Sequence, residues 1–169
     1  MRKVLNAVYN GAGALAALCM VSLLVMVLLS ILGRELHFHV RGTDAYAGYL
    51  MAGAGFLALA HTLKRGEHIR VTLLITKLTG STQRAMEVWS LFAASFLTGL
   101  FAFYSVKLVV NSYQFNDIST SNDATPLWIP QIMMALGAIV LLVAFLDDLV
   151  MEIRGKREVF QSAEALHNE

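Results

Sequence analysis

The chain has 169 residues, of which 57% are hydrophobic and 15% are charged, and its mean hydropathy is +0.61. Soluble domains are nearer half apolar and a quarter charged, so this composition excludes an ordinary soluble domain and indicates a membrane protein. The formal net charge of +1 excludes a protein that gathers nucleic acid through its electric field.

The first predicted span lies between Lys3 and Arg34, which enclose thirty residues without Asp, Glu, Lys or Arg. The apolar run is longer than the roughly 7 to 15 residues of a signal peptide, so we expect a retained transmembrane helix at about 10–33. A lipoprotein signal ending at Cys19 would need a small residue where Leu18 stands. Cys19 is the only cysteine and is expected to act as a small packing residue.

Three further charge-free windows follow. They hold nineteen residues between Asp44 and Lys64, nineteen between Glu87 and Lys107, and twenty-three between Asp123 and Asp147. Each reaches the roughly 17 to 25 residues that cross about 30 Å of hydrocarbon, whereas a chain of this size has too little protein to bury four such helices in a soluble core. We therefore predict an all-α integral membrane fold in a single membrane domain, 1–169, whose later spans lie at about 45–63, 86–108 and 126–147.

The segment between the second and third predicted spans has an amphipathic pattern. Val71, Leu74, Ile75 and Leu78 follow the spacing of one helical face, and Gly80 comes directly after. This pattern predicts a short interfacial helix at about 69–79.

The distribution of Lys and Arg predicts the orientation. Ten of these residues fall on the side that holds both termini and the middle loop, and three fall on the other side, namely Arg34, Arg41 and Lys107. Since positive loops stay inside, both termini are expected in the cytoplasm. Trp89 and Trp128 fall at opposite predicted membrane boundaries, where amphipathic rings are favoured.

Few side chains are suited to catalysis or to binding a metal or cofactor. The only titratable side chain well inside a predicted span is His61, which is a candidate haem ligand or a locally hydrogen-bonded histidine. His37 and His39 suggest a metal, but only Glu35 and Asp44 stand nearby to complete a site. We predict no enzyme activity, no catalytic, substrate-binding or metal site, no cofactor, and no ion pathway within this chain.

The second predicted span is rich in small residues that allow close helix approach in lipid. Packing within the bundle and packing against another subunit both fit the candidate helix-packing residues Gly48, Ala52, Gly53 and Gly55.

One run of residues carries a family resemblance. Leu63-Lys64-Arg65-Gly66-Glu67-His68-Ile69-Arg70-Val71, after Gly33-Arg34 and Asp44, resembles the small permease subunit, of the Q or DctQ type, of tripartite ATP-independent periplasmic (TRAP) transporters. The Pro126-Leu127-Trp128-Ile129-Pro130 run is also similar to this family. Family members often carry an acidic pair at the entrance to the second helix, where this chain has Asp44 alone.

The resemblance implies a multi-pass protein of the bacterial inner membrane that supports a large permease subunit. Its other implied partners are membrane lipids and a periplasmic substrate-binding protein, which delivers an organic acid for sodium-driven uptake. Candidate residues for partner docking or for anchoring helix ends are Arg34, Asp44, Arg65, Glu67, His68 and Arg70. For Arg34 and Asp44, the alternative role is helix capping and contact with lipid headgroups. For the four later residues, the alternative is a solvated turn that anchors to anionic lipid.

Two other functions remain as alternatives. A haem- or quinone-bearing anchor subunit of an oxidoreductase would need axial histidines inside facing helices, and only His61 is near such a place. A stand-alone multidrug exporter would need a membrane-embedded carboxylate, and the acidic residues all fall at or outside the span edges.

Overall fold

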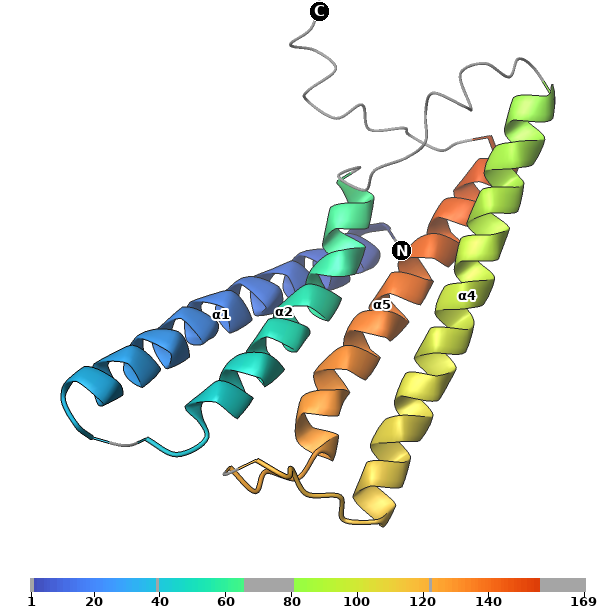
Figure 1. Cartoon of the computed structure of the whole chain (residues 1–169). Coiled ribbons are helices and arrows are strands. Elements are labelled where there is room, and N and C mark those ends of the chain that lie inside the picture. The colour runs from blue at the N-terminus through green and yellow to red at the C-terminus, as the bar shows by residue number, and fades with distance from the viewer. Residues whose placement is uncertain (1, 39, 66–80, 122, 156–169) are drawn as a thin grey trace, which may run out of the picture.

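The computed structural model describes residues 2–38, 40–65, 81–121 and 123–155, and these residues form four helices. The helices, in chain order, are α1 (Arg2–Glu35), α2 (Thr43–Lys64), α4 (Ser81–Gln114) and α5 (Trp128–Ile153) (Figure 1). The prediction of an all-helical protein is confirmed. The expected interfacial helix at about 69–79 lies outside the described residues.

Each helix is longer than the span predicted for it. α4 begins at Ser81 and ends at Gln114, well beyond the predicted span at 86–108, and α5 begins at Trp128 and continues to Ile153. The difference has a simple cause, because charge-free windows mark the residues that tolerate hydrocarbon, whereas a helix continues into polar surroundings as long as its backbone hydrogen bonds continue.

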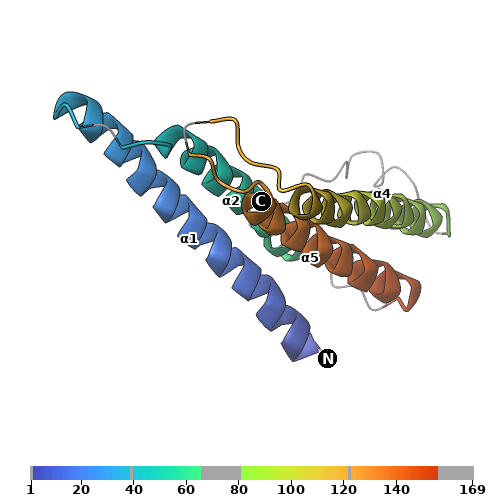
Figure 2. The same ribbon diagram turned by 90° about the horizontal axis from the view of Figure 1, so that it is seen from below.

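The four helices form a layer one helix thick. α2 packs against α1 on one side and α5 on the other, α4 packs against α5, and α1 makes only slight contact with α5. Figure 2 shows α1 running at an angle to the α4–α5 pair. We call the end where α1 begins and α5 ends the terminal end, and the opposite end, with the connections 36–42 and 115–127, the loop end.

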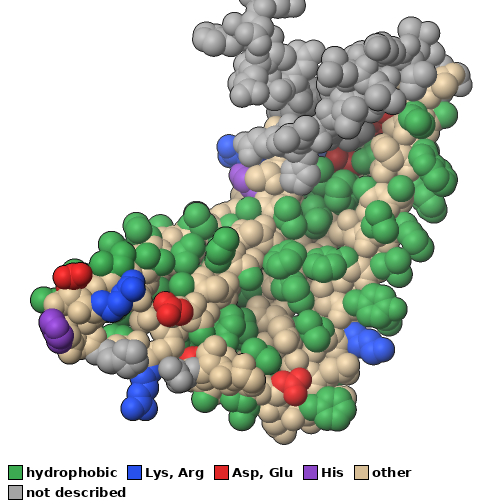
Figure 3. Space-filling view, viewed as in Figure 1, with side chains coloured by type: hydrophobic (Ala, Val, Ile, Leu, Met, Phe, Trp, Pro, Cys, Tyr) green, Lys and Arg blue, Asp and Glu red, His purple; other side chains and the backbone are tan. Residues whose placement is uncertain are grey.

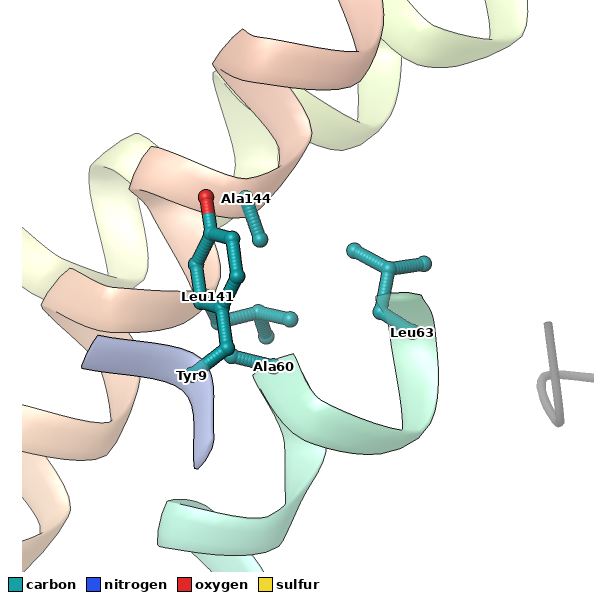
Figure 4. Packing of buried hydrophobic residues seen from close by; sticks show 5 residues of the cluster. All are labelled: Tyr9, Ala60, Leu63, Leu141 and Ala144. Carbon is teal, nitrogen blue, oxygen red and sulfur yellow. The ribbon is translucent and has the colours of Figure 1, made fainter. Parts of the chain in front are cut away.

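Small residues allow the helices to approach closely. One buried cluster joins α1, α2 and α5 through Tyr9, Ala60, Leu63, Leu141 and Ala144 (Figure 4). The α2 and α5 backbones approach closely at Gly137 of α5, where a Cβ atom would stand 2.5 Å from the carbonyl oxygen of Phe56 on α2. Without glycine at this position, α2 and α5 could not hold this separation.

Most large apolar side chains lie on the outside of the layer. Hydrophobic side chains line the length of α4 on the face shown in Figure 3. Phe96 and Phe103 of α4 are 60% and 63% exposed. Soluble monomers rarely expose continuous apolar surface on this scale, and in a bilayer such side chains contact lipid at no cost.

Three helices among the described residues, α1, α4 and α5, are long and apolar enough to cross a membrane. The sequence prediction counted four spans, and α2 is the helix that does not meet this criterion. Its composition explains the difference, since Tyr46, Tyr49, His61 and several glycines lower its hydropathy. α2 is also flanked by helices on two sides, so less of its surface needs to be apolar.

α1 and α4 end in the same backbone motif. His37 and Asn116 follow the two helices with φ of 57° and 50°. The next N–H group in each case donates back to a carbonyl of the last turn, from Phe38 to Gly33 and from Asp117 to Ser112, both at 3.0 Å. This arrangement satisfies helix-end carbonyls and turns the chain sharply. After α1 it brings Phe38 back against Gly33 in the last turn of the helix.

Candidate functional site

A charged cluster at the terminal end joins three helices. Lys64 Nζ on α2 donates to Asp147 Oδ2 at 2.6 Å and to Asp148 Oδ1 at 2.7 Å, both on α5. The same ammonium group lies 5.4 Å from the ring centroid of Tyr9 on α1, within the range of a cation–π contact. The Lys64, Asp147 and Asp148 side chains are only 22%, 29% and 13% exposed, so solvent screens the ion pairs weakly. The cluster therefore fixes the axial positions of α1, α2 and α5 relative to one another.

A hydrogen-bonded network at the loop end joins α2 to the 115–127 connection. The Tyr49 hydroxyl lies 3.0 Å from Ser119 Oγ and 3.2 Å from Asp123 Oδ2, and the Ser119 hydroxyl donates to Asp123 Oδ1 at 2.8 Å. Gly42, with φ of 80°, lies so close that a Cβ atom would stand 2.7 Å from the Cβ of Asp123. The connection is thus held against the start of α2 by side-chain bonds and by close packing.

The network changes the acidity of Asp123. Burial raises the pKa of this carboxyl group, but hydrogen bonds from Thr125, Ser119, its own backbone N–H and Tyr49 together outweigh burial and hold the pKa below its ordinary value of 3.8. Because the folded-state pKa is the lower one, ionised Asp123 stabilises the fold above the unfolded-state pKa, and that stabilisation is lost as the pH falls through the folded-state pKa.

We expect Asp123→Asn to lower the thermal unfolding midpoint in detergent at pH 6, since the amide loses the charge-assisted hydrogen bonds. The difference from the unsubstituted protein should shrink below about pH 4 and vanish once the aspartate itself is protonated. Thermal unfolding, followed by circular dichroism at several pH values, measures the midpoint of each protein and how the difference between them changes with pH. Asp117→Asn, at an exposed position of the same connection, should leave the midpoint unchanged throughout. If the midpoint of Asp123→Asn differed from that of the unsubstituted protein by the same amount at every pH, ionised Asp123 would not be the source of the stabilisation.

The candidate docking residues Arg34 and Asp44 come together at the loop end. Both line one hollow of about 420 Å³ between the last turn of α1 and the first turn of α2. Of the other candidates, Arg65 is exposed directly after α2, and its backbone N–H donates to the His61 carbonyl at 3.1 Å. Glu67, His68 and Arg70 lie outside the described residues.

The candidate helix-packing residues separate into two groups. Gly53 is buried, and a Cβ atom added to it would stand 2.8 Å from Met133 Sδ on α5 and 3.6 Å from Cys19 Sγ on α1. Gly48 and Gly55 have no atom within 4 Å of a Cβ position, and Ala52 is exposed. Gly53 thus packs inside the layer, and the other three form a small-residue strip on the outside of α2.

The two tryptophans lie near opposite ends of the layer. Trp89, 65% exposed, follows the first two turns of α4 at the terminal end, with its ring centroid 6.1 Å from that of Phe92. Trp128 begins α5 at the loop end, and its ring meets Tyr113 edge-on at 5.7 Å.

Of the described histidines, His37 lines the loop-end hollow and His61 lies on α2. His61 is half-buried against Gly13 of α1, where a Cβ atom would stand 2.9 Å from its ring. Within the described ranges, no group of three or more His, Cys, Asp and Glu side chains is placed to hold a metal ion. His39 lies outside these ranges.

Sequence reasoning used Lys64, Asp147 and Asp123 as edges of charge-free windows, and Lys64 also as part of the run that carries the family resemblance, but it missed what they bond to. Opposite charges at the ends of two windows that meet at the same membrane face were the available signal for the Lys64 cluster. The partnership of Tyr49 with Asp123 had no such signal, because it depends on how the 115–127 connection folds over α2.

The comparison with protein families gives one match. The model of the family described as tripartite ATP-independent periplasmic transporters, DctQ component, matches residues 23–155. No curated protein matches the sequence. The match spans the last turns of α1 and all of α2, α4 and α5, so it includes the hollow, the network at the loop end and the ion pairs of Lys64, but not Tyr9.

Proposed function

The chain belongs to the DctQ component family of TRAP transporters, and from this premise we propose that it is a scaffold that holds a large permease subunit in the bacterial inner membrane. The proposed complex takes up an organic acid, driven by a sodium gradient and supplied by a periplasmic binding protein. Substrate and sodium then bind to the large subunit, and this chain holds the large subunit in place in the membrane.

The placement of charge in the described helices supports a scaffold. Every Asp, Glu, Lys and Arg in these helices stands within about two turns of a helix end. A solute pathway normally needs ionisable groups or broken helices near the middle of the membrane. The family match does not support the alternative of a haem- or quinone-bearing anchor subunit.

In this proposal all four described helices cross the bilayer. α2 crosses as the central helix, protected by α1 and α5, which accounts for its lower hydropathy. The terminal end faces the cytoplasm, in keeping with the excess of Lys and Arg on that side, and the loop end faces the periplasm. The Arg65, Glu67, His68 and Arg70 segment then meets the cytoplasmic leaflet, and the loop end meets the binding protein.

The large subunit needs a surface within the membrane. The small-residue strip of α2, made of Gly48, Ala52 and Gly55, supports close approach by a helix of that subunit, because a Cβ at either glycine would meet nothing in the described chain and Ala52 is exposed. The proposed contact is consistent with a one-layer fold, which leaves both faces of α2 open to a neighbour.

Copurification followed by reconstitution tests the proposal. The chain, tagged and extracted from its native membrane in mild detergent, should retain a large multi-spanning permease. Proteoliposomes that contain both proteins should take up, in a sodium-dependent manner, whichever radiolabelled dicarboxylate, 2-oxo acid or sugar acid the cognate binding protein retains. Undiminished uptake by the large subunit alone would contradict the scaffold, as would uptake by this chain alone. An absorption band of haem in the pure chain would favour the anchor subunit.

A further inference from the structure

The hollow at the loop end has the composition of a binding site. Its volume of about 420 Å³ lies in the range of roughly 300 to 1,000 Å³ that is usual for small-molecule sites. Polar groups come from Ser30, Arg34, His37, Thr43 and Asp44, while Leu29 and Phe38 contribute apolar wall. Gly33 lets the returning chain pack closely against α1, since a Cβ there would stand 2.8 Å from the Phe38 carbonyl oxygen.

The charged groups of the hollow do not pair with each other. Among the described residues Arg34 has no ion pair and no side-chain hydrogen bond, and the Asp44 carboxylate has one weak contact, from Ser30 Oγ at 3.5 Å. Arg34 and Asp44 are both exposed. Two opposite charges without ion-pair partners on one hollow leave hydrogen-bonding capacity for a ligand.

Helix-end electrostatics explains each charge separately but not the arrangement. Arg34 lies in the last turn of α1 and Asp44 in the first turn of α2, so each charge complements the dipole of its own helix. That role requires no shared hollow. Two opposite charges on one small cavity match a ligand that itself carries both signs, because Asp44 repels a simple anion and Arg34 repels a simple cation.

We propose that this hollow binds the headgroup of a zwitterionic phospholipid with a primary ammonium group. The phosphate pairs with Arg34, whose guanidinium group suits bidentate contact, and the ammonium donates to the Asp44 carboxylate. Leu29 and Phe38 contact the glycerol and the first methylene groups at the point where the apolar part of α1 ends. The inference requires that α1 and α2 end at a bilayer surface, and it does not depend on the transporter partnership.

Native mass spectrometry of the full chain tests the proposal, with detergent micelles doped in turn with phosphatidylethanolamine, phosphatidylcholine and phosphatidylglycerol. We expect preferential retention of phosphatidylethanolamine. Arg34→Gln should weaken its binding by about tenfold, the effect of losing one charge-assisted bond. Asp44→Asn should reverse the preference toward anionic phosphatidylglycerol, since it removes the negative charge that pairs with the ammonium group and leaves the arginine. A purely structural role for Asp44 would not reverse a lipid preference.

The matched controls are Arg41→Gln and Glu35→Gln, which change exposed charges near the hollow but outside its lining. Both should leave the lipid preference unchanged. Equal retention of the three lipids by the unsubstituted chain, or the same preference in Asp44→Asn, would overturn the proposal. Soluble glycerophosphoethanolamine provides a further arm, because binding as tight as that of the intact lipid would mean that the site takes a soluble solute and not a membrane lipid.

Discussion

Lys64→Met should lower the free energy of unfolding by about 3 kcal/mol, the lower bound for removing one partner from a buried ion pair. The substitution leaves the Asp147 and Asp148 carboxylates together at the terminal end without the ammonium group that binds both. We take the lower bound because the three side chains retain some contact with solvent. Titration with sodium dodecyl sulfate in mixed micelles, followed by circular dichroism, measures the change.

A rescue variant separates lost charge balance from lost packing. The triple variant Lys64→Met, Asp147→Asn, Asp148→Asn removes the repulsion, so it should recover most of the stability that Lys64→Met loses. Lys107→Met provides the matched control, since Lys107 is exposed on α4 and has no ion pair within the described residues. It should change the stability by less than about 0.5 kcal/mol. Equal losses in Lys64→Met and Lys107→Met would show that the cluster holds nothing together.

Gly137→Ala should lower the free energy of unfolding by about 2 kcal/mol, because an overpacking cost near the upper figure of about 3 kcal/mol is partly offset by the gain of about 1 kcal/mol that alanine brings to a helix. A Cβ at this position would stand 2.5 Å and 2.6 Å from the carbonyl oxygen and carbon of Phe56, and this backbone cannot rotate away as a side chain can. The same detergent titration measures the net effect.

Gly55→Ala on α2 serves as the control for Gly137→Ala. Nothing lies within 4 Å of its Cβ position, so the variant should keep or slightly raise the stability through the helix propensity of alanine. A Gly137→Ala protein as stable as Gly55→Ala would mean that α2 and α5 do not approach as closely as described. If the proposed contact with a large subunit lies on this strip, Gly55→Ala should weaken copurification while leaving the isolated chain stable.

The helical architecture was predictable because it depends on one strong signal. Charge is so costly in hydrocarbon that its absence over nineteen or more residues marks a membrane segment. The neighbours of each helix were not predictable, since glycines that pack and glycines that face outward look alike in a sequence. Gly53 and Gly55 differ by two positions on one helix, yet one lies against Met133 and the other has nothing beside it.

The candidate site was predictable in part. Arg34 and Asp44 were predicted as candidate docking or anchoring residues from their positions at helix ends, and the structure places both on one hollow. The hollow itself depends on the turn after α1, where His37 adopts the positive φ that glycine usually supplies, so no sequence pattern marks the motif. The Tyr49 and Asp123 contact likewise joins residues 74 positions apart.

A layer one helix thick has area but no lumen. Ala138 and Ala144 are fully covered, but most large apolar side chains face outward, so the bilayer and any neighbouring helices act as the outer half of the hydrophobic core. Such a layer owes much of its rigidity to the lipid and the neighbouring helices that pack against it. Its stability should therefore respond to membrane thickness and to subunit assembly far more than that of a closed bundle of equal mass.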